Sequence, residues 1–302
     1  MKHFFVVNPV SGNGIAVKKY LPQLLSYLKD SDLDYEIHRS LNKEEIGTYV
    51  RQHASAGDDV RFYAVGGDGT LCDVVNGAVG FRNVEVGVIP CGTGNDFVRN
   101  FTNRENFRNF EKLVNGKAMP VDVLKVGDIY SINMLNIGAD CEVVARAAQL
   151  KSRSGSLSYI RGALDILPKN PKYKMVYTDE SGTDHEEYLM LCAIANGHFC
   201  GGGFKSCPRA SVDDGLMDVV IVRPVTGLRM LKLLLKYHNG THLADKSAVD
   251  VIQYLQVRDF SLKPLDKVNV SIDGEVQPFT GADITIIPGA VKFVVPEGSE
   301  PI

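Results

Sequence analysis

The stretch that decides the fold is a glycine-rich segment between two regular runs, Ala64-Val65-Gly66-Gly67-Asp68-Gly69-Thr70-Leu71. The apolar run at 61–65 predicts a strand before it, and residues 71–79 predict a helix after it. Glycine lets backbone amides approach an anion closely, and amides at a helix N-terminus add partial positive charge. The segment is therefore typical of a phosphate-binding turn. A tight turn without a ligand is the alternative.

Asp68 is an unusual residue for the centre of such a turn. A carboxylate repels phosphate, so the segment suits an anion only if a cation lies between the two. Mg²⁺ prefers carboxylate and phosphate oxygens as ligands. The sequence therefore predicts that Asp68 acts through a magnesium ion.

Two further glycine turns follow predicted strands, residues 8–14 after strand 4–7 and residues 89–97 after strand 84–89. The carboxyl ends of parallel strands share one edge of a sheet, where open α/β sheets bind ligands. Three turns at equivalent places indicate a ligand site more strongly than one. None fits the Walker A pattern or the dinucleotide pattern GxGxxG.

The order of predicted elements changes along the chain and indicates two domains. Up to about residue 125, strands alternate with helices, which favours a parallel sheet covered by helices; the strands are 4–7, 35–38, 61–65 and 84–89, and the helices 16–28, 43–53, 71–79 and one from Asn95. Later segments favour an antiparallel β-sandwich; they are strands 121–126, 130–137, 173–178, 189–195, 217–222, 247–258, 267–272 and 291–295, and helices 141–151, 156–167 and 225–237. We expect an α/β domain at 1–124 and a β-rich domain at 125–289, with about 290–302 packing back on the first.

Composition excludes several classes of protein. Glycine contributes 29 of 302 residues without a period, and 33 basic against 36 acidic residues give a net charge of −3. That charge provides no general attraction for nucleic acid. The first residues do not predict a secretory leader, and the sequence shows no run of about 20 apolar residues. The six cysteines form no CxxC pair, so free thiols in a cytoplasmic protein are favoured over a zinc site at His198, Cys200 and Cys207.

Two basic stretches are candidates for contact with a membrane surface. Residues 227–238 predict an amphipathic helix with interleaved leucines and basic residues, as in helices that lie on anionic lipid. The second stretch carries Lys151, Arg153, Arg161 and Lys169. The alternative for both is an ordinary solvated helix packed on the sandwich.

The glycine turns resemble those of a known family. Gly66–Thr70 with Asn76-Gly77, and Pro90–Phe97, resemble the diacylglycerol kinase catalytic domain. The chain as a whole is similar to the soluble bacterial lipid kinases of that superfamily, because its other motifs also follow in the family's order: Asn8–Gly12, Asn136–Asp140, Pro208–Leu216 and Asp273–Glu275.

This resemblance implies ATP-dependent phosphorylation of a lipid hydroxyl, with the nucleotide between an α/β domain and a β-sandwich. It implies that Asp68 contacts ATP through Mg²⁺, that Asp96 helps to fix the second loop, and that Glu275 accepts the hydroxyl proton. It also implies a structural Mg²⁺ at Asp214 with the carbonyls of Ser211 and Leu216. The nucleotide-binding residues it indicates are Asn8, Ser11, Gly12, Ser40, Gly66, Gly67, Asp68, Gly69, Thr70, Leu71, Cys72, Thr93, Gly94, Asp96 and Asp273.

Two details of this assignment rest on the residues themselves. Asp273 and Glu275 are two apart, so on a strand they would share one face, although Asp-Gly is also a common hairpin turn. Some family members carry a basic residue at the position of Asn13. Here the nearest lysines are Lys18 and Lys19, on the predicted helix.

The resulting expectation is a cytoplasmic, membrane-peripheral enzyme that uses ATP and Mg²⁺ to convert diacylglycerol to phosphatidic acid, a step of phospholipid biosynthesis. Its expected partners are ATP and a lipid at a membrane surface, with room for a homodimer. A sphingoid-base kinase differs only in its lipid pocket. An NAD kinase shares the Gly-Gly-Asp-Gly turn and phosphorylates a soluble nucleotide. A non-catalytic sensor is disfavoured by the retained Asp68, Asp214 and Glu275.

Overall fold

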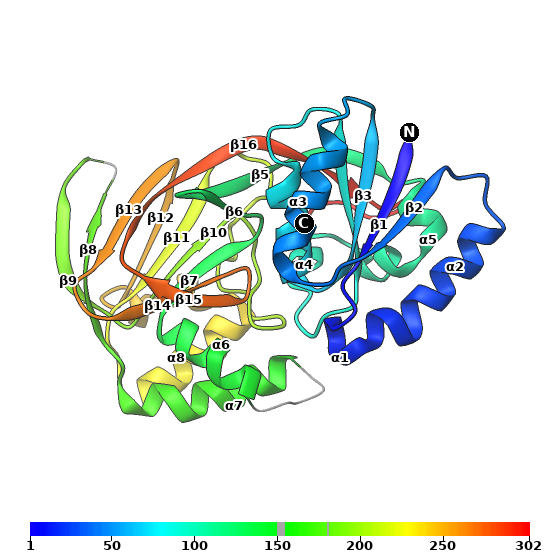
Figure 1. The fold of residues 1–302 in the computed structure, drawn as a ribbon. Coiled ribbons are helices and arrows are strands. Elements are labelled where there is room, and N and C mark those ends of the chain that lie inside the picture. Colours follow the sequence, from blue (N-terminus) through cyan, green and yellow to red (C-terminus); the bar gives the residue numbers. More distant parts are fainter. Residues whose placement is uncertain (150–154, 180) are drawn as a thin grey trace. The chain divides into compact units, whose positions relative to one another are not determined.

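The computed structural model describes residues 1–149, 155–179 and 181–302 (Figure 1). The chain forms two compact units, residues 1–123 together with 288–302, and residues 124–287. In the part of the chain described, no helix combines the length and the apolar character needed to cross a bilayer.

A parallel sheet forms the centre of the first unit. Its strands follow the order β2 (Tyr35–Arg39), β1 (Lys2–Val7), β3 (Val60–Gly66), β4 (Val84–Pro90) and the C-terminal part of β16 (Ala282–Val295). Strands β1, β3 and β4 are almost wholly buried apolar runs, as expected for a parallel sheet covered by helices. The helices are α2 (Leu21–Lys29), α3 (Lys43–Ala54), α4 (Asp68–Ala78) and α5 (Phe110–Val114). The predicted α/β architecture is confirmed.

Aromatic pairs fix the register between neighbouring strands. Phe4 lies opposite Phe62 and Phe5 opposite Tyr63, with ring centroids 4.9 and 4.6 Å apart. Such cross-strand pairs specify register, because a slip of one residue would turn every side chain to the other face. The register places the ends of β1 and β3 level, so the loops that follow them leave the same edge of the sheet.

The structure corrects two helix predictions in this unit. The helix predicted from residue 16 begins with a π-helical turn, Ala16–Tyr20, preceded by a short segment α1 (Ser11–Ile15) that contains three left-handed residues. The helix predicted from Asn95 is wrong. Asn95 has a φ of 49°, so no continuous right-handed helix starts there. The 3₁₀ helices Phe97–Asn100 and Arg104–Arg108 follow, and an α-helix, α5, begins only at Phe110.

The second unit is a two-sheet sandwich, as predicted. One sheet is antiparallel throughout; its strands in order are β12 (Ile252–Val257), β11 (Met217–Val222), β10 (Leu191–Ala195), β7 (Met134–Gly138), β14 (Val268–Ile272) and β15 (Glu275–Phe279). The other contains β9 (Asp184–Leu189), β8 (Tyr173–Thr178), β13 (Asp259–Pro264) and the first part of β16, and a hairpin of β5 (Lys117–Val126) and β6 (Ile129–Ser131) also joins β16.

The central strands of the six-stranded sheet, β11, β10 and β7, are buried on both faces, and alternation along them separates two cores. In β10, Cys192 and Ile194 pack toward the other sheet, whereas Ala193 and Ala195 belong to a different cluster. Three helices, α6 (Ala139–Gln149), α7 (Gly155–Ile166) and α8 (Gly227–Asn239), contribute side chains to that second cluster. Short 3₁₀ turns complete the unit at Leu167–Lys169, His242–Ala244 and Lys246–Ala248.

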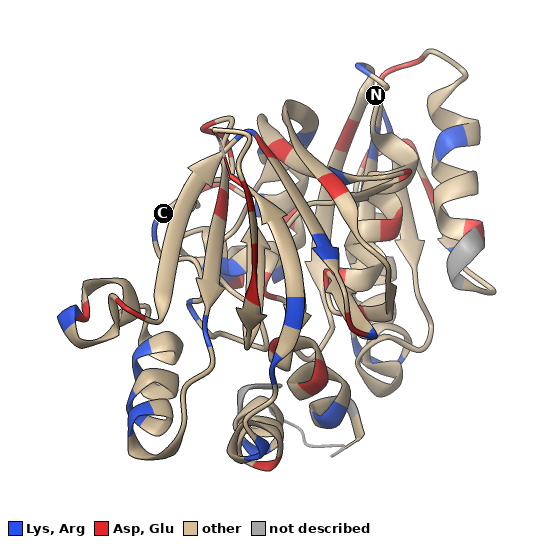
Figure 2. Ribbon diagram, turned by 90° about the vertical axis from the view of Figure 1, so that its left-hand side faces the viewer, with Lys and Arg blue, Asp and Glu red and all other residues tan. Residues whose placement is uncertain are grey.

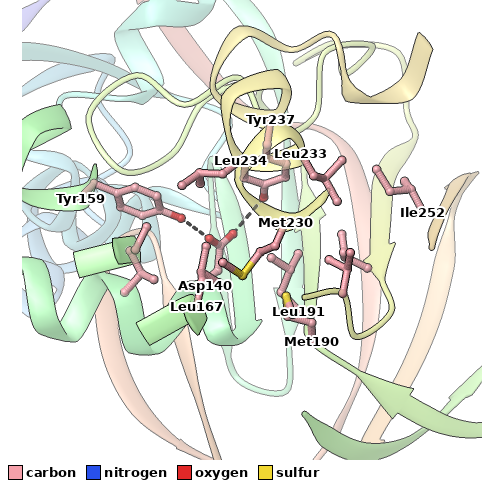
Figure 3. Close-up of a pocket in the computed structure, with 14 residues that line it drawn as sticks. Asp140, Tyr159, Leu167, Met190, Leu191, Met230, Leu233, Leu234, Tyr237 and Ile252 are labelled. Carbon is pink, nitrogen blue, oxygen red and sulfur yellow. Dashed lines mark hydrogen bonds between the residues drawn. The ribbon is translucent and has the colours of Figure 1, made fainter. Parts of the chain in front are cut away.

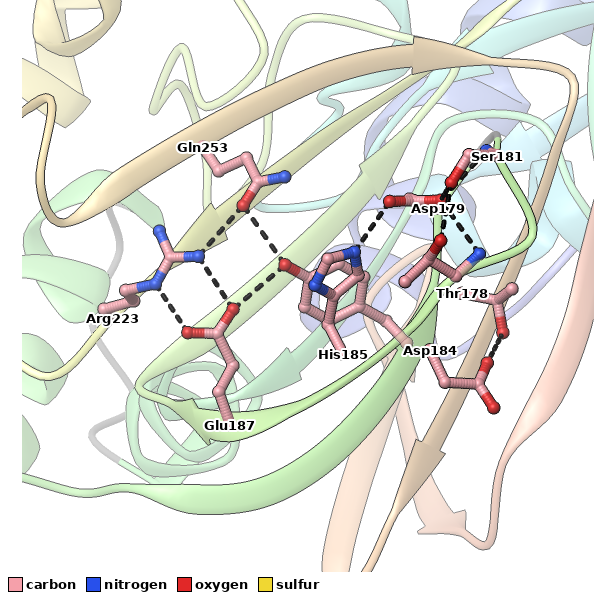
Figure 4. Close-up of polar contacts among 10 residues, drawn as sticks. Thr178, Asp179, Ser181, Asp184, His185, Glu187, Arg223 and Gln253 are labelled. Atoms are coloured by element: carbon pink, nitrogen blue, oxygen red, sulfur yellow. Dashed lines mark hydrogen bonds and ion pairs between the residues drawn. The ribbon is translucent and has the colours of Figure 1, made fainter.

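A polar network connects the two sheets of the sandwich at one edge (Figure 4). Arg223, just after β11, binds both carboxylate oxygens of Glu187 on β9, at 2.5 and 2.7 Å. Tyr177 of β8 donates to Glu187 at 2.9 Å, and Arg223 also donates to Gln253 of β12 at 3.0 Å. Burial alone would raise the pKa of Glu187, but the hydrogen bonds from Arg223 and Tyr177 lower it below its usual value.

Several strand predictions in this unit needed correction. The predicted strand 130–137 is two strands separated by a bend, and the predicted strand 247–258 begins only at Ile252. Strands β13 and β15 were not predicted, because each carries charged or polar residues along much of its length. The basic residues Lys151 and Arg153 lie outside the described residues.

Candidate functional site

Three glycine loops pack directly on one another in the first unit. They are the turns after β1, β3 and β4 (Figure 1). A methyl group built on Gly12 would lie 2.1 Å from the carbonyl oxygen of Cys91, and one built on Gly92 would lie 2.6 Å from the Cα of Gly67. Distances this short leave no room for a side chain. These glycines are therefore required for loop-to-loop packing, a role that the sequence alone does not reveal.

Thr70 joins the first loop to helix α4. Its hydroxyl accepts a hydrogen bond from Asn8 Nδ2 at 3.1 Å and lies 3.3 Å from the hydroxyl of Ser11. Thr70 is buried in the first turn of α4, beside Gly69. The structure thus brings together four of the predicted nucleotide-binding residues, Asn8, Ser11, Gly12 and Thr70.

Asp68 joins the second loop to the third. Its Oδ1 accepts hydrogen bonds from the backbone N–H groups of Asp96 at 2.8 Å and Phe97 at 3.3 Å. The carboxylate of Asp96 instead pairs with Arg99 at 3.2 Å. Both side chains therefore take part in ordering this loop, and Asp68 makes the contact that crosses between loops.

Two carboxylates converge on Gly94. A methyl group built there would lie 3.0 Å from Asp68 Oδ2 and 3.2 Å from Asp96 Oδ2. A side chain at position 94 would fill the space toward which both oxygens point. Two carboxylates beside a glycine turn suit Mg²⁺, which takes few protein ligands and completes its octahedron with water and phosphate oxygens. Within the described ranges no group of three or more His, Cys, Asp or Glu residues could hold a metal. A magnesium ion at Asp68 and Asp96 would therefore take its remaining ligands from water and phosphate.

The other predicted nucleotide contacts occupy different environments. Ser40, after β2, is buried and donates its N–H to the carbonyl of Val7 at 3.0 Å, at the end of β1. Leu71 and Cys72 point into the core, and Thr93 is exposed. Cys91 is also buried; burial raises the pKa of its thiol to about 12, so it stays protonated.

The structure adds a basic residue to this cluster. Lys18 folds back over the first loop, where a methyl group built on Gly14 would lie 3.6 Å from its Cε and 3.9 Å from its Nζ. Gly12, Asn13 and Gly14 all have positive φ, a conformation that turns successive backbone amides toward one side. Lys19 instead covers the ring of Tyr20, 5.2 Å from its centroid. In the sequence the two lysines are adjacent and equivalent, and only the fold separates their positions.

In the second unit, Asp273 and Glu275 do not lie along one strand, so the shared-face prediction is wrong. Asp273 and Gly274 form the left-handed turn of the β14–β15 hairpin, with φ of 45° and 91°. Asp273 is buried, and its carboxylate accepts bonds from the hydroxyl of Ser131 at 2.7 Å and from the backbone amides of residues 132–134 at 3.0–3.1 Å. Glu275 is exposed at the start of β15.

The loop predicted to hold a structural metal is ordered by its own side chains. Asp214 Oδ1 accepts the N–H of Leu216 at 3.0 Å, and the hydroxyl of Ser211 donates to Asp213 at 2.8 Å. Burial and the neighbouring Asp213 charge raise the pKa of Asp214. Asp218 lies buried at the start of β11, where burial raises its pKa to about 6. A cation beside Asp214 would offset both the burial of its carboxylate and the repulsion from Asp213. The residues of this loop therefore suit a cation.

An apolar pocket with one buried acid was not found from the sequence (Figure 3). Asp140, at the start of α6, is 3% exposed and lies between two tyrosines of α7 and α8. Tyr159 donates to its Oδ1, and Tyr237 donates to its Oδ2 at 2.9 Å. The sequence could mark Asp140 only as part of a motif, because its partners lie far along the chain.

Comparison with known proteins gives the class of this chain. Residues 2–126 match the model of the diacylglycerol kinase catalytic domain, and residues 133–295 match the YegS C-terminal NAD kinase beta sandwich-like domain. A protein of Staphylococcus epidermidis named "Putative lipid kinase" is 30% identical over 293 residues, which cover 93% of this chain and 91% of that one. The diacylglycerol kinase of Bacillus subtilis is 27% identical, covering 89% and 88%. A diacylglycerol kinase structure from Bacillus anthracis superposes with a TM-score of 0.69, at 21% identity, over 98% of this chain and 97% of that one.

The chain therefore belongs to the lipid kinase family that carries the diacylglycerol kinase catalytic domain. It is accordingly an enzyme of the lipid kinase class, as the resemblance implied.

Proposed function

We propose that the protein transfers the γ-phosphoryl group of Mg-ATP to the hydroxyl of diacylglycerol and yields phosphatidic acid. The observation that carries this proposal is the joined set of three glycine loops, with the Asp68 and Asp96 carboxylates converging on Gly94. Phosphoryl transfer needs positioning and charge neutralisation more than covalent chemistry. Backbone amides and a Mg²⁺ held by the two acids would supply both.

In this proposal the first unit binds the nucleotide. The amides of Gly66, Gly67 and Gly69, at the N-terminus of α4, would face the ATP phosphates, and the Thr93 hydroxyl would contact the nucleotide. A Mg²⁺ ion held by Asp68 and Asp96 would neutralise charge that develops on the phosphoryl oxygens. Lys18 would supply the basic contact that Asn13 lacks.

The second unit would present the lipid and the base. As the lipid hydroxyl oxygen forms a bond to the γ-phosphorus, the bond from that phosphorus to the β–γ bridging oxygen breaks and ADP leaves. The hydroxyl proton passes to the carboxylate of Glu275, which is exposed and accessible to a substrate. Asp273 would hold the hairpin that carries Glu275, and Asp214 with the carbonyls of Ser211 and Leu216 would hold a structural Mg²⁺.

We further propose that the enzyme works at the cytoplasmic face of a membrane. Large apolar side chains are exposed on α8 and α7, with Leu228 at 67%, Leu235 at 61% and Leu164 at 53%. Positive charge on α8 contributes less to attraction for anionic lipid than the sequence suggested, because Arg229 pairs with Asp250 and Lys236 with Asp245. Acidic and basic residues are interspersed along the strands and helices (Figure 2). Contact with lipid would therefore be driven mainly by leucines.

The test is a comparison of acceptors with radiolabelled γ-phosphate ATP and Mg²⁺. The full chain would be given 1,2-dioctanoylglycerol in mixed micelles, or NAD in solution. The proposal predicts label in the lipid. Label in NAD alone would show a nucleotide kinase, and release of phosphate without label in any lipid would overturn the lipid acceptor.

A second experiment tests the base. Glu275→Gln keeps the shape of the side chain but cannot take a proton, so kcat should fall by about 10²-fold or more while ATP binding is retained. Glu186→Gln, on β9, serves as a matched control for an exposed strand glutamate. Near-normal turnover of Glu275→Gln would exclude its role as base.

A further inference from the structure

Residues 297–302, here called the strap, follow β16 and lie along residues 100–112 of the same unit. Backbone contacts join the two segments at several points. They are the antiparallel bridge of Phe101 with Pro301, the N–H of Thr102 on the carbonyl of Glu300 at 2.8 Å, and the N–H of Glu297 on the carbonyl of Lys112 at 3.0 Å. The strap is therefore bonded to the first unit from one end to the other.

A buried side chain, Asn106, also holds the strap. Its Nδ2 donates to the carbonyl of Glu297 at 3.1 Å and to the hydroxyl of Ser299 at 3.2 Å. Its Oδ1 accepts a hydrogen bond from Nζ of Lys112 at 3.0 Å. Replacement of Asn106 would therefore loosen the strap at a point that is nine positions away from Phe97 in the chain.

The 3₁₀ turn Phe97–Asn100 connects the strap to the third glycine loop. On the strap side, the N–H of Ile302 donates to the carbonyl of Asn100 at 3.0 Å. On the loop side, Asn100 Nδ2 donates to the carbonyl of Phe97 at 2.9 Å, and the N–H of Phe97 donates to Asp68 Oδ1 at 3.3 Å. Asn100 is only 1% exposed, so water does not compete for its amide. A continuous series of hydrogen bonds therefore leads from the strap to Asp68.

The same turn places Arg99 on the third loop. Arg99 Nη2 donates to the carbonyl of Gly94 at 3.2 Å, and its Nε pairs with Asp96 Oδ1 at 3.2 Å. The backbone N–H of Arg99 also donates to the carbonyl of Asp96, at 3.1 Å. A displacement of the turn would therefore move groups that hold both of the carboxylates beside Gly94.

Apolar packing holds one side of this turn. The ring of Phe97 meets that of Phe293 on β16 edge to face, with centroids 4.9 Å apart, and Phe101 contacts the same ring at 5.5 Å. Apolar contact is non-directional, whereas a hydrogen bond depends on the direction of the N–H group. The rings therefore fix where the turn lies, and the hydrogen bonds from the strap help to fix where its N–H groups point.

We propose that the strap positions the carboxylates of the candidate magnesium site through this turn, with Asn100 as the positioning residue. The inference rests on the proposed function, in which Asp68 and Asp96 bind the metal of Mg-ATP. If the turn were free to move, binding of the metal would have to order both carboxylates, and that ordering would cost affinity. The strap should therefore act on the metal-dependent part of nucleotide binding.

Hydrogen–deuterium exchange of the full chain without nucleotide tests the structural link. Ile302→Pro removes the N–H that bonds to Asn100, whereas the control Ile302→Ala keeps it. In Ile302→Pro the amides of Asp96 and Phe97 should exchange at least about fivefold faster than in the wild type. Ile302→Ala should exchange as the wild type does. Equal exchange rates at these two amides in both variants would overturn the inference.

A second pair of variants reaches the strap from its other side. Asn106→Ala removes the side-chain bonds to the strap and should accelerate exchange of the same two amides. Asn109→Ala removes a hydrogen bond of the same segment, to the N–H of Lys112 at 3.1 Å, but none to the strap. It should leave exchange at Asp96 and Phe97 unchanged. Equal acceleration by both variants would show general loosening and would also overturn the inference.

Calorimetric titration with ATP tests the consequence for the metal. The Kd of Mg-ATP should rise by about fivefold or more in Ile302→Pro and in Asn106→Ala, relative to their alanine controls. The Kd of ATP measured in EDTA should change by less than about twofold, because the glycine amides are left in place. A merely structural loss would weaken both forms of the nucleotide alike, and that result would contradict a role in positioning the metal ligands.

These outcomes separate the inference from the proposed function. If the wild-type protein bound no Mg-ATP but Ile302→Pro still accelerated exchange at Asp96 and Phe97, the proposed reaction would fail and the link from the strap to Asp68 would stand. If the wild-type protein phosphorylated a lipid but neither exchange nor the Kd of Mg-ATP responded to the variants, the reaction would stand and the role of the strap would be refuted.

Discussion

Gly94 shows why one position of the third loop is a glycine. A methyl group on it would lie 3.0 Å from an oxygen of Asp68 and 3.2 Å from an oxygen of Asp96, so any side chain there would crowd both carboxylates. The sequence indicated Asp68 and Mg²⁺ from chemical reasoning, since a lone carboxylate in a phosphate turn needs a cation. It could not indicate the convergence of Asp68 with Asp96, because 28 positions separate them.

Gly94→Ala tests this arrangement directly. The added methyl should displace the carboxylates and raise the Mg²⁺ concentration needed for half-maximal activity by about tenfold or more. Magnesium titration of the initial rate measures it. Gly47→Ala, where the methyl would meet its nearest atom only at 3.4 Å, is the control. An unchanged magnesium titration for Gly94→Ala would show that the metal lies elsewhere.

Lys18 is the residue whose role depends most on the fold. From the sequence it is one of two adjacent lysines, and only the turn at 12–14 distinguishes it. Lys18→Ala should lower kcat/KM for ATP by about tenfold, the size expected for one hydrogen bond to a charged group. Lys19→Ala should have little effect. Equal effects of both substitutions would argue for general positive charge instead of a specific contact.

Among the elements, the β14–β15 hairpin differs most from its prediction, which placed Asp273 and Glu275 on one face of a strand. Asp-Gly was correctly recognised as a turn signal, but the function of Asp273 could not be predicted. Hydrogen bonds to its carboxylate come from residues 131–134, about 140 positions earlier in the chain. Asp273 therefore orders the start of β7 and the hairpin together, and holds Glu275 in position through the turn.

Asp273→Ala should be strongly destabilising. Removal of the carboxylate leaves buried amides without an acceptor, so the free energy of unfolding should fall by about 3 kcal/mol. Urea denaturation at neutral pH measures this. Asp266 accepts one bond, from the N–H of Lys174 at an exposed site, and Asp266→Ala should cost under about 1 kcal/mol. Similar urea midpoints for the two variants would contradict the structural role of Asp273.

The Arg223–Glu187 pair makes the stability of the sandwich depend on pH. The folded state lowers the pKa of Glu187. The ion pair therefore contributes its full share to the free energy of unfolding above the unfolded pKa, about 4.3, and this share is lost as pH falls through the lower folded pKa. The urea midpoint of wild-type protein should therefore exceed that of Glu187→Gln at pH 7, and the difference should shrink between pH 5 and pH 3. A constant difference across that range would contradict the assignment.

At the scale of the whole molecule, the sequence predicted the order of helices and strands better than which elements pack against one another. Continuous apolar strands and periodic helices identified an α/β unit and a β-sandwich, and both are present. The six-stranded sheet shows the limit. A fully apolar strand such as β10 does not reveal that its alternate residues serve two different cores, and the pocket of Asp140 lies in the second of them.

The central claim is that the three joined loops use Mg-ATP to phosphorylate a lipid, with Asp68 as the residue that makes the metal site. Asp68→Asn is the sharpest probe, because its amide oxygen can still accept the N–H groups of Asp96 and Phe97 while its charge is lost. The measurement is transfer of radiolabelled γ-phosphate from Mg-ATP to dioctanoylglycerol. The predicted result is lipid labelling by the wild-type protein that requires Mg²⁺ and falls by about 10²-fold or more in a folded Asp68→Asn variant. Equal labelling by both proteins, or none by the wild type with any lipid, would contradict the claim.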